Sequence, residues 1–167
     1  MGLFSTPITT LDDLFVHTLQ DMYYAEIQIV KSLPGMIEKA SNPQLQAAFE
    51  AHLTETRGHV ARLEQVFALH GQPLKAITCA AMDGILAEAR DIARDCDDAD
   101  TRDAAMLSAA QAIEHYEMTR YGSLIAFAKQ LGRADCVSIL QQTLEEEKAA
   151  DKKLTDVANS RVNRLAA

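Results

Sequence analysis

The sequence predicts an all-α fold, a four-helix bundle made of two pseudo-symmetric helical hairpins with a short crossover helix between them. Apolar side chains recur at three- and four-residue spacing along most of the 167 residues, and no stretch alternates as a β-strand would. In addition, an offset of 91 residues aligns residues 10–66 with residues 101–157 without a gap and gives ten identities. In this internal repeat Glu26 matches Glu117, and Glu55 matches Glu146.

The first hairpin is predicted over residues 9–70. Its first helix begins at the run Thr9 to Asp13, which is typical of an N-cap followed by an acidic first turn. Pro34-Gly35 should either end that helix or kink it before a last turn through Ala40, because proline lacks the backbone donor that a helix interior needs. Asn42-Pro43 then supplies a cap and an N1 proline for the second helix, which the segment at residues 70–73 closes.

The second hairpin is predicted over residues 100–160, after a crossover at residues 74–99 that contains the short helix. Asp100 or Thr101 is the expected N-cap of the third long helix. A crossover of this length lets the second hairpin run in either direction relative to the first, so the topology need not be simple up-down-up-down. We treat residues 1–167 as a single domain, because a chain of this length can bury one sizeable core.

The composition excludes several classes of function. The formal net charge is −8 at pH 7, so neither nucleic acid nor an anionic membrane is an expected partner, whereas metal cations are. The three cysteines are widely separated and form no Cys-x-x-Cys pair, which argues against a disulfide framework or a thiolate zinc site. No apolar run is long enough to span a membrane, and the N-terminus lacks the basic-then-apolar order of a signal peptide, so we expect a cytoplasmic protein.

Acidic side chains interrupt the apolar faces of the predicted helices. Glu26 falls on the same face as Leu19 and Met22, and Glu117 falls on the same face as Ile113, so both acids should point into the bundle. Buried carboxylates without compensation are costly and repel one another, and a bound cation accounts for them most simply. The candidate metal ligands are Glu26, His52, Glu55, His59, Glu114, Glu117, Glu146, Glu147 and Asp151.

The second helix supplies the nitrogen donors. His52, Glu55 and His59 lie at positions i, i+3 and i+7, so they project from one side of the helix, beside its apolar stripe. Imidazole combined with carboxylate suits iron, manganese or zinc, whereas a site made only of oxygen donors would suit magnesium or calcium. The expected cofactor is therefore two ions of iron, or of manganese or zinc in its place.

The third and fourth long helices supply further acids. Glu114 lies three residues before Glu117 and shares its side of the third helix. On the fourth helix two alternatives stay open, because the repeat selects Glu146 whereas the apolar stripe selects Glu147 and Asp151.

At these residues the chain resembles the YciE/YciF family of ferritin-like proteins. The resemblance implies a ferritin-like four-helix bundle with a short extra helix, a dimeric state and a role in a bacterial stress response. The matching stretches are Asp21–Glu26 (DMYYAE), Ala51–His59 (AHLTETRGH), Arg62–Gln65 (RLEQ), Ala110–Glu117 (AQAIEHYE) and Thr143–Asp151 (TLEEEKAAD).

The wider ferritin and rubrerythrin class binds two irons through a glutamate on one helix of each pair and Glu-x-x-His on the other. This chain departs from that spacing, because no histidine lies three residues after Glu55 or after Glu146. His52 or His59 would replace it on the second helix. Asp151 would replace it on the fourth.

Two functions are consistent with these residues. In the first, a di-metal carboxylate protein binds Fe²⁺ and oxidises it with O₂ or peroxide, as a ferroxidase- or peroxidase-type enzyme, with the four tyrosines that flank the acids as hydrogen-bond donors. In the second, a metal-free structural bundle uses its acids and histidines as polar networks that fix helix register. In either case we expect a homodimer, because apolar residues occupy more than one helix face, with Ile27 and Ile29 as interface candidates.

Overall fold

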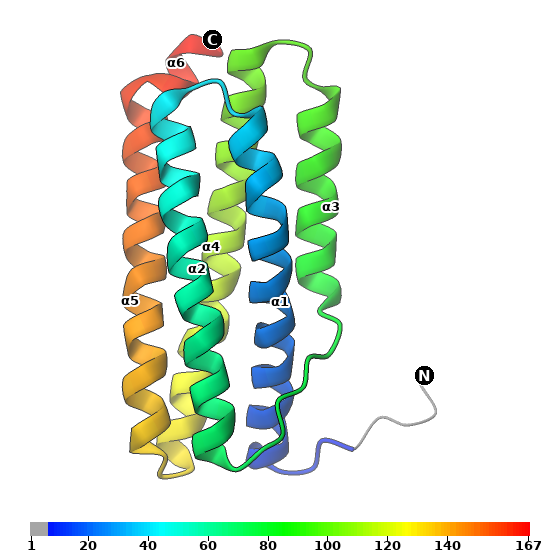
Figure 1. The fold of residues 1–167 in the computed structure, drawn as a ribbon, viewed down its shortest axis with the longest axis vertical. Coiled ribbons are helices and arrows are strands. Elements are labelled where there is room, and N and C mark those ends of the chain that lie inside the picture. The colour runs from blue at the N-terminus through cyan, green and yellow to red at the C-terminus, as the bar shows by residue number, and fades with distance from the viewer. Residues whose placement is uncertain (1–6) are drawn as a thin grey trace.

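The computed structural model describes residues 7–167 and shows a bundle of four long helices with a fifth helix along one side (Figure 1). No strand occurs in this range, and no helix in it is long and apolar enough to cross a membrane. The predicted all-α fold is therefore confirmed. The long helices are α1 (Leu11–Lys39), α2 (Pro43–His70), α4 (Ala99–Gln130) and α5 (Ala134–Val157).

The crossover contains the predicted short helix, α3 (Ala80–Asp95), which packs on α4 and α1 outside the four-helix core. Helices α2 and α4 run in one direction, and α1 and α5 run in the other (Figure 1). The topology is therefore not simple up-down-up-down, as the long crossover allows. After α5 the chain ends in a π-helical turn, η1 (Ala158–Val162), and a short helix, α6 (Asn163–Leu165).

Local capping residues set the helix boundaries. The Thr10 side chain accepts a hydrogen bond from the Asp13 N–H, and the Asp13 carboxylate accepts one from the Thr10 N–H, which forms a capping box at the start of α1. The Asn42 side chain caps α2, and Pro43 occupies its first turn. Gly71 ends α2 with φ of 71°, a left-handed conformation that glycine adopts without strain.

One helix boundary differs from the prediction, and another takes one of its predicted forms. Helix α1 continues through Pro34 to Lys39, which agrees with the predicted last turn through Ala40, because the side chains of its last turns, including the buried Leu33, pack against the core and offset the lost backbone hydrogen bond. The N-cap of α4 is Asp98, rather than Asp100 or Thr101. Its carboxylate reaches the Thr101 N–H at 2.7 Å and so satisfies a donor of the first turn.

The core is one continuous apolar cluster that runs along the bundle and includes the fully buried rings of Phe15, Phe67 and Tyr121. Ile29 belongs to this core and exposes only 1% of its surface, so its prediction as a dimer-interface residue is wrong. Ile27 is partly exposed. The homodimer itself stays a prediction.

A buried carboxylate ties the turn between α1 and α2 to α4. Asp103, which is 1% exposed, accepts hydrogen bonds from the Ser41 N–H at 2.9 Å, the Ser41 hydroxyl at 2.6 Å and the Asn42 N–H at 2.7 Å. These bonds satisfy backbone donors just before α2 begins. They also fix where the first hairpin meets the second.

We predict that Asp103→Ala lowers the free energy of unfolding by about 2–3 kcal/mol, because three donors lose a charged acceptor. Urea unfolding followed by circular dichroism measures the change. Asp97→Ala removes an exposed acid from the same acidic segment and serves as the matched control. Equal losses of stability in the two variants would contradict the role assigned to Asp103.

Candidate metal centre

Six ionisable side chains converge inside the bundle, and all four long helices contribute to them. Each exposes 7% or less of its surface. We name these residues the acid-histidine cluster; they are Glu26 of α1, His52 and His59 of α2, Glu114 and Glu117 of α4, and Glu147 of α5.

The donor atoms of the cluster form two groups, and within each group the atoms lie within 4.8 Å of one another. The first group comprises His52, Glu114, Glu117 and Glu147, and the second comprises Glu26, His59 and Glu147. Glu147 belongs to both groups. Its carboxylate therefore lies where a ligand shared by two metal ions would be needed.

Most polar atoms of the cluster have no hydrogen-bond partner. Within the described part of the chain, eleven buried side-chain nitrogen and oxygen atoms lack one, and nine of these belong to the cluster. They include both carboxylate oxygens of Glu117 and Glu147 and both ring nitrogens of His52. Each buried polar atom left unpaired costs about 1–3 kcal/mol, so the donor set fits cations that would satisfy several atoms at once.

Neighbouring side chains orient Glu26 and His59. The Tyr121 hydroxyl donates a hydrogen bond to Glu26. The Nε2 atom of His59 lies 3.0 Å from Glu146, a carboxylate that can only accept, so Nε2 carries the hydrogen. The other nitrogen, Nδ1, then lies 2.9 Å from Glu147 and 3.6 Å from Glu26. Fixing one nitrogen of an imidazole by a carboxylate leaves the other nitrogen placed for a metal.

Burial raises the pKa of three acids in the cluster, Glu114, Glu117 and Glu147. Burial, together with the neighbouring carboxylate of Glu147, raises the pKa of Glu114 to about 10. Burial and nearby carboxylates raise the pKa of Glu117 well above its usual value, and burial raises that of Glu147. In the metal-free protein, protons bound to these acids therefore reduce their mutual repulsion.

The pKa values of the two histidines of the cluster are shifted in opposite directions. Burial lowers the pKa of His52 to about 4, so its ring is neutral near pH 7. Burial also acts to lower the pKa of His59, but the carboxylates of Glu147 and Glu26 outweigh it and raise that pKa to about 11. A protonated His59 is therefore the positive charge that the metal-free cluster contains.

Three predicted candidates lie outside the cluster. Glu55 is exposed on α2. Glu146 precedes Glu147 on α5, so its side chain is rotated by about 100° from that of Glu147 and points toward Arg62. The Arg62 guanidinium donates a hydrogen bond of 2.9 Å to Glu146. Asp151 lies beside the exposed His115, with 3.3 Å between their nearest atoms. The structure therefore places six of the nine candidate ligands together.

On α2 and α5 the inward-facing positions of the repeat lie one residue after Glu55 and Glu146, so of the alternatives left open on α5 the structure buries Glu147. The same 91-residue offset pairs Thr56 with Glu147 and His59 with Ala150, and all four residues are buried. Each second helix thus keeps half of a Glu-x-x-His pattern, with threonine in place of the acid on α2 and alanine in place of the histidine on α5. The apolar stripe already contained this signal, through Thr56 on α2 and through Glu147 on α5, whereas the identity of Glu55 and Glu146 selects two exposed or half-exposed acids.

The fold and the cluster define a ferritin-like helical bundle with a candidate two-metal centre. The chain belongs to the DUF892 family, described as a domain of unknown function, whose model matches residues 10–167. It is 42% identical over 158 residues to Protein YciF of Escherichia coli (strain K12), a match that covers 94% of this chain and 95% of YciF. The predicted resemblance to the YciE/YciF family is confirmed.

Solved structures share the fold. YcfI from Rhodopseudomonas palustris is 48% identical, with a TM-score of 0.89 over 92% of this chain and 98% of that chain. The crystal structure of the E. coli stress protein YciF is 42% identical, also with a TM-score of 0.89, over 93% and 99% of the two chains. A Xanthomonas campestris protein at 20% identity, with a TM-score of 0.75 over 93% and 95%, shows the fold alone.

We predict that the metal-free protein loses stability as the pH rises from about 6.5 to about 10. Folded Glu114 and His59 keep their protons in this range, with pKa values of about 10 and about 11, whereas the unfolded chain releases them at their ordinary pKa values of 4.5 and 6.5. Their contribution is complete below those unfolded values and is lost as the pH rises through the folded ones. Urea unfolding of chelator-treated protein at several pH values measures this.

Two comparisons sharpen that experiment. Glu114→Gln removes one of the titrating groups and should flatten the pH dependence, whereas Glu88→Gln, at an exposed position of α3, should leave it unchanged. Stability that rises with pH across the same range would contradict the assignment of bound protons.

Proposed function

We propose that the acid-histidine cluster binds two divalent metal ions that share Glu147. The observation that supports this most strongly is the presence of Glu147 in both groups of donor atoms. The charge of the cluster also supports two ions. The cluster contains four glutamates, and four carboxylates balance the charge of two divalent cations when both histidines are neutral. A single divalent cation would leave two buried negative charges that only protons could neutralise.

The mixed donor set suits iron, manganese or zinc, and we propose iron as the metal. One ion would be held by the first group of donors, which contains His52, and the other by the second group, which contains His59. When bound, iron supplies one-electron redox chemistry at this site. The contribution of the protein is to hold the donors in place and to exclude water.

Residues around the cluster would set the affinity for the metal. Tyr121 holds Glu26 by its hydrogen bond, and Arg62 holds Glu146 against His59. Because the pKa of His59 is raised to about 11 in the metal-free protein, its Nδ1 proton must leave before that nitrogen can bind a metal. Metal binding should therefore release protons and weaken as the pH falls.

We predict that Glu147→Gln abolishes the binding of both ions and leaves the bundle folded. Glutamine keeps the shape of the side chain but provides neither the charge nor the two anionic oxygens that a shared ligand needs. Elemental analysis of protein purified without chelator should give about two metal equivalents for the wild type and about none for the variant. Glu145→Gln, at an exposed acid on the same helix that pairs with Lys148, is the matched control.

Thermal unfolding provides the second measurement. Fe²⁺, Mn²⁺ or Zn²⁺ should raise the melting temperature of the wild type and of Glu145→Gln, because an ion that binds only the folded state stabilises it. If none of the three ions binds or moves the melting curve, and Glu147→Gln is strongly destabilised, the cluster is a structural polar network. The metal-free bundle would then be the correct description.

We further propose that bound Fe²⁺ is oxidised by O₂ or peroxide and that this reaction serves a stress response. The support is the carboxylate-rich donor set together with the description of the E. coli relative as a stress protein. Fe²⁺ is the reductant in this proposal, and O₂ or peroxide is the electron acceptor.

Mixing anaerobic Fe²⁺-loaded protein with O₂ or with hydrogen peroxide tests this activity. The ferric absorbance should grow faster with the wild type and Glu145→Gln than with Fe²⁺ in buffer, whereas Glu147→Gln should match the buffer. Equal rates for the wild type and buffer would exclude the oxidase activity without affecting the conclusion about metal binding.

A further inference from the structure

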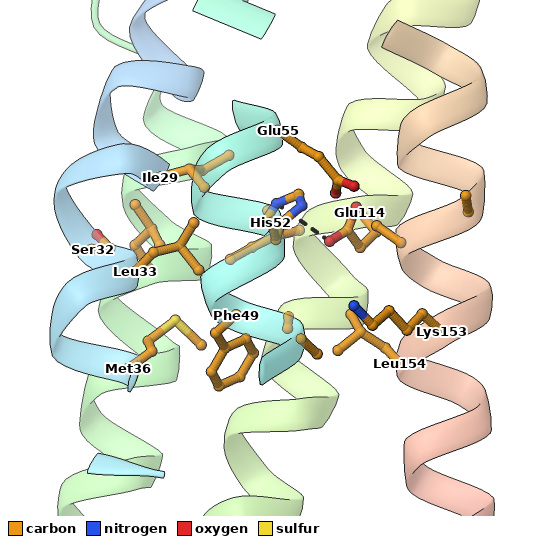
Figure 2. A pocket seen from close by; sticks show the side chains of 16 residues that line it. Ile29, Ser32, Leu33, Met36, Phe49, His52, Glu55, Glu114, Lys153 and Leu154 are labelled. Carbon is orange, nitrogen blue, oxygen red and sulfur yellow. Dashed lines mark ion pairs between the residues drawn. The ribbon is translucent and has the colours of Figure 1, made fainter. Parts of the chain in front are cut away.

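A cavity of about 110 Å³ lies beside the acid-histidine cluster, bordered by α1, α2, α3, α4 and α5 (Figure 2). Apolar side chains form most of its wall, and they include Leu33, Met36, Phe49, Ile113 and Leu154. In Figure 2, Met36 and Phe49 lie at the end of the cavity away from Glu55.

The cavity also contains polar groups without hydrogen-bond partners, and these groups belong to the first group of candidate metal donors. His52 and Glu114 line it, and their nearest atoms, Nε2 and Oε1, are 3.4 Å apart, the contact that is dashed in Figure 2. His52 is 7% exposed, neither of its ring nitrogens has a hydrogen-bond partner, and Oε2 of Glu114 also lacks one. A few unpaired polar groups in an otherwise apolar cavity are typical of a small-molecule site, where they orient the ligand.

Small side chains on α5 create the space. Ala149 and Ala150 both line the cavity, and Ala150 is the residue that the internal repeat pairs with His59. A larger side chain at position 150 would project into the cavity, because the alanine already lies on its wall. The alanine at position 150, which the repeat pairs with His59, therefore leaves part of the cavity open.

The exposed wall residues limit the charge of a ligand. Glu55 and Lys153 line the cavity and are both exposed, and Figure 2 shows them on either side of Glu114. One acid and one base at the exposed side attract neither anions nor cations strongly, because their fields oppose each other. The walls therefore favour a neutral ligand.

We propose that this cavity binds a small neutral alcohol or phenol, with its apolar body against Leu33 and Phe49 and its hydroxyl toward His52 and Glu114. A hydroxyl both donates and accepts, so it matches the free carboxylate oxygen and the free ring nitrogens. Since an engineered cavity of about 150 Å³ holds benzene, about 110 Å³ limits the ligand to roughly the size of one six-membered ring. The inference goes beyond the proposed metal chemistry and concerns the metal-free protein, in which His52 and Glu114 can contact the ligand.

Fluorine NMR of 4-fluorophenol with the chelator-treated full-length protein tests the proposal. Wild type should bind the probe saturably, and it should bind 4-fluorotoluene, which lacks the hydroxyl, roughly fivefold more weakly through the loss of one hydrogen bond. No saturable binding at millimolar probe would overturn the proposal. Equal affinity for the two probes would overturn the role given to His52 and Glu114.

Two substitutions that fill the cavity locate the binding. Ala149→Leu at the exposed side and Ala110→Leu from α4 should each weaken 4-fluorophenol binding by about tenfold or more, because a leucine side chain occupies the space of the probe. Ala61→Leu makes the same change at an exposed position of α2 away from the cavity and should bind as wild type does.

Circular dichroism of each variant shows whether it has folded. The exposed position of Ala149 tolerates leucine even if the buried Ala110 does not, so at least one of the two tests can be read. Wild-type affinity in a folded Ala149→Leu variant would overturn the proposal. Metal binding is measured separately on the same preparations, so the failure of either proposal leaves the other intact.

Discussion

The rest of the structure depends on how the negative charge of four carboxylates, buried together between four helices, is balanced. Their donor atoms lie within 4.8 Å of one another in two overlapping groups, where unbalanced charges would repel strongly in a medium of low polarity. The raised pKa values of Glu114, Glu117 and Glu147 and the positive His59 are responses to this constraint. The hydrogen bonds of His59 and Glu26 also respond to it, because they hold both side chains in fixed orientations.

The architecture around the cluster keeps these donors at fixed positions. Each long helix contributes at least one member of the cluster, so a shift of one hairpin against the other would separate the two groups. Asp103 opposes such a shift at one end by joining the α1–α2 turn to α4. The pairing of His70 with Asp12, at 3.0 Å between their nearest atoms, joins the end of α2 to the start of α1. Because these contacts fix both ends of the bundle, its middle can hold buried carboxylates that repel one another.

Helical periodicity and the internal repeat were sufficient to predict the fold, and Glu26 and Glu117 could be placed because the repeat and the apolar stripe agree on both. The two signals disagree on α5. Neighbouring residues of a helix are rotated by about 100° from each other, which places Glu147 inside the bundle and Glu146 at its surface. A match of identical residues between the two repeats does not show which of the two side chains points inward. Neither signal could have located the cavity, because its size depends on how closely the helices pack around Ala150.

The two halves of the internal repeat differ at their buried positions. On α2 the pattern is Thr56 with His59, and on α5 it is Glu147 with Ala150, so the repeat does not extend to the donors of these two helices. One group has four residues and the other has three, with Glu147 in common. Two ions held there would have different sets of protein ligands, four residues for one and three for the other, so their affinities would differ.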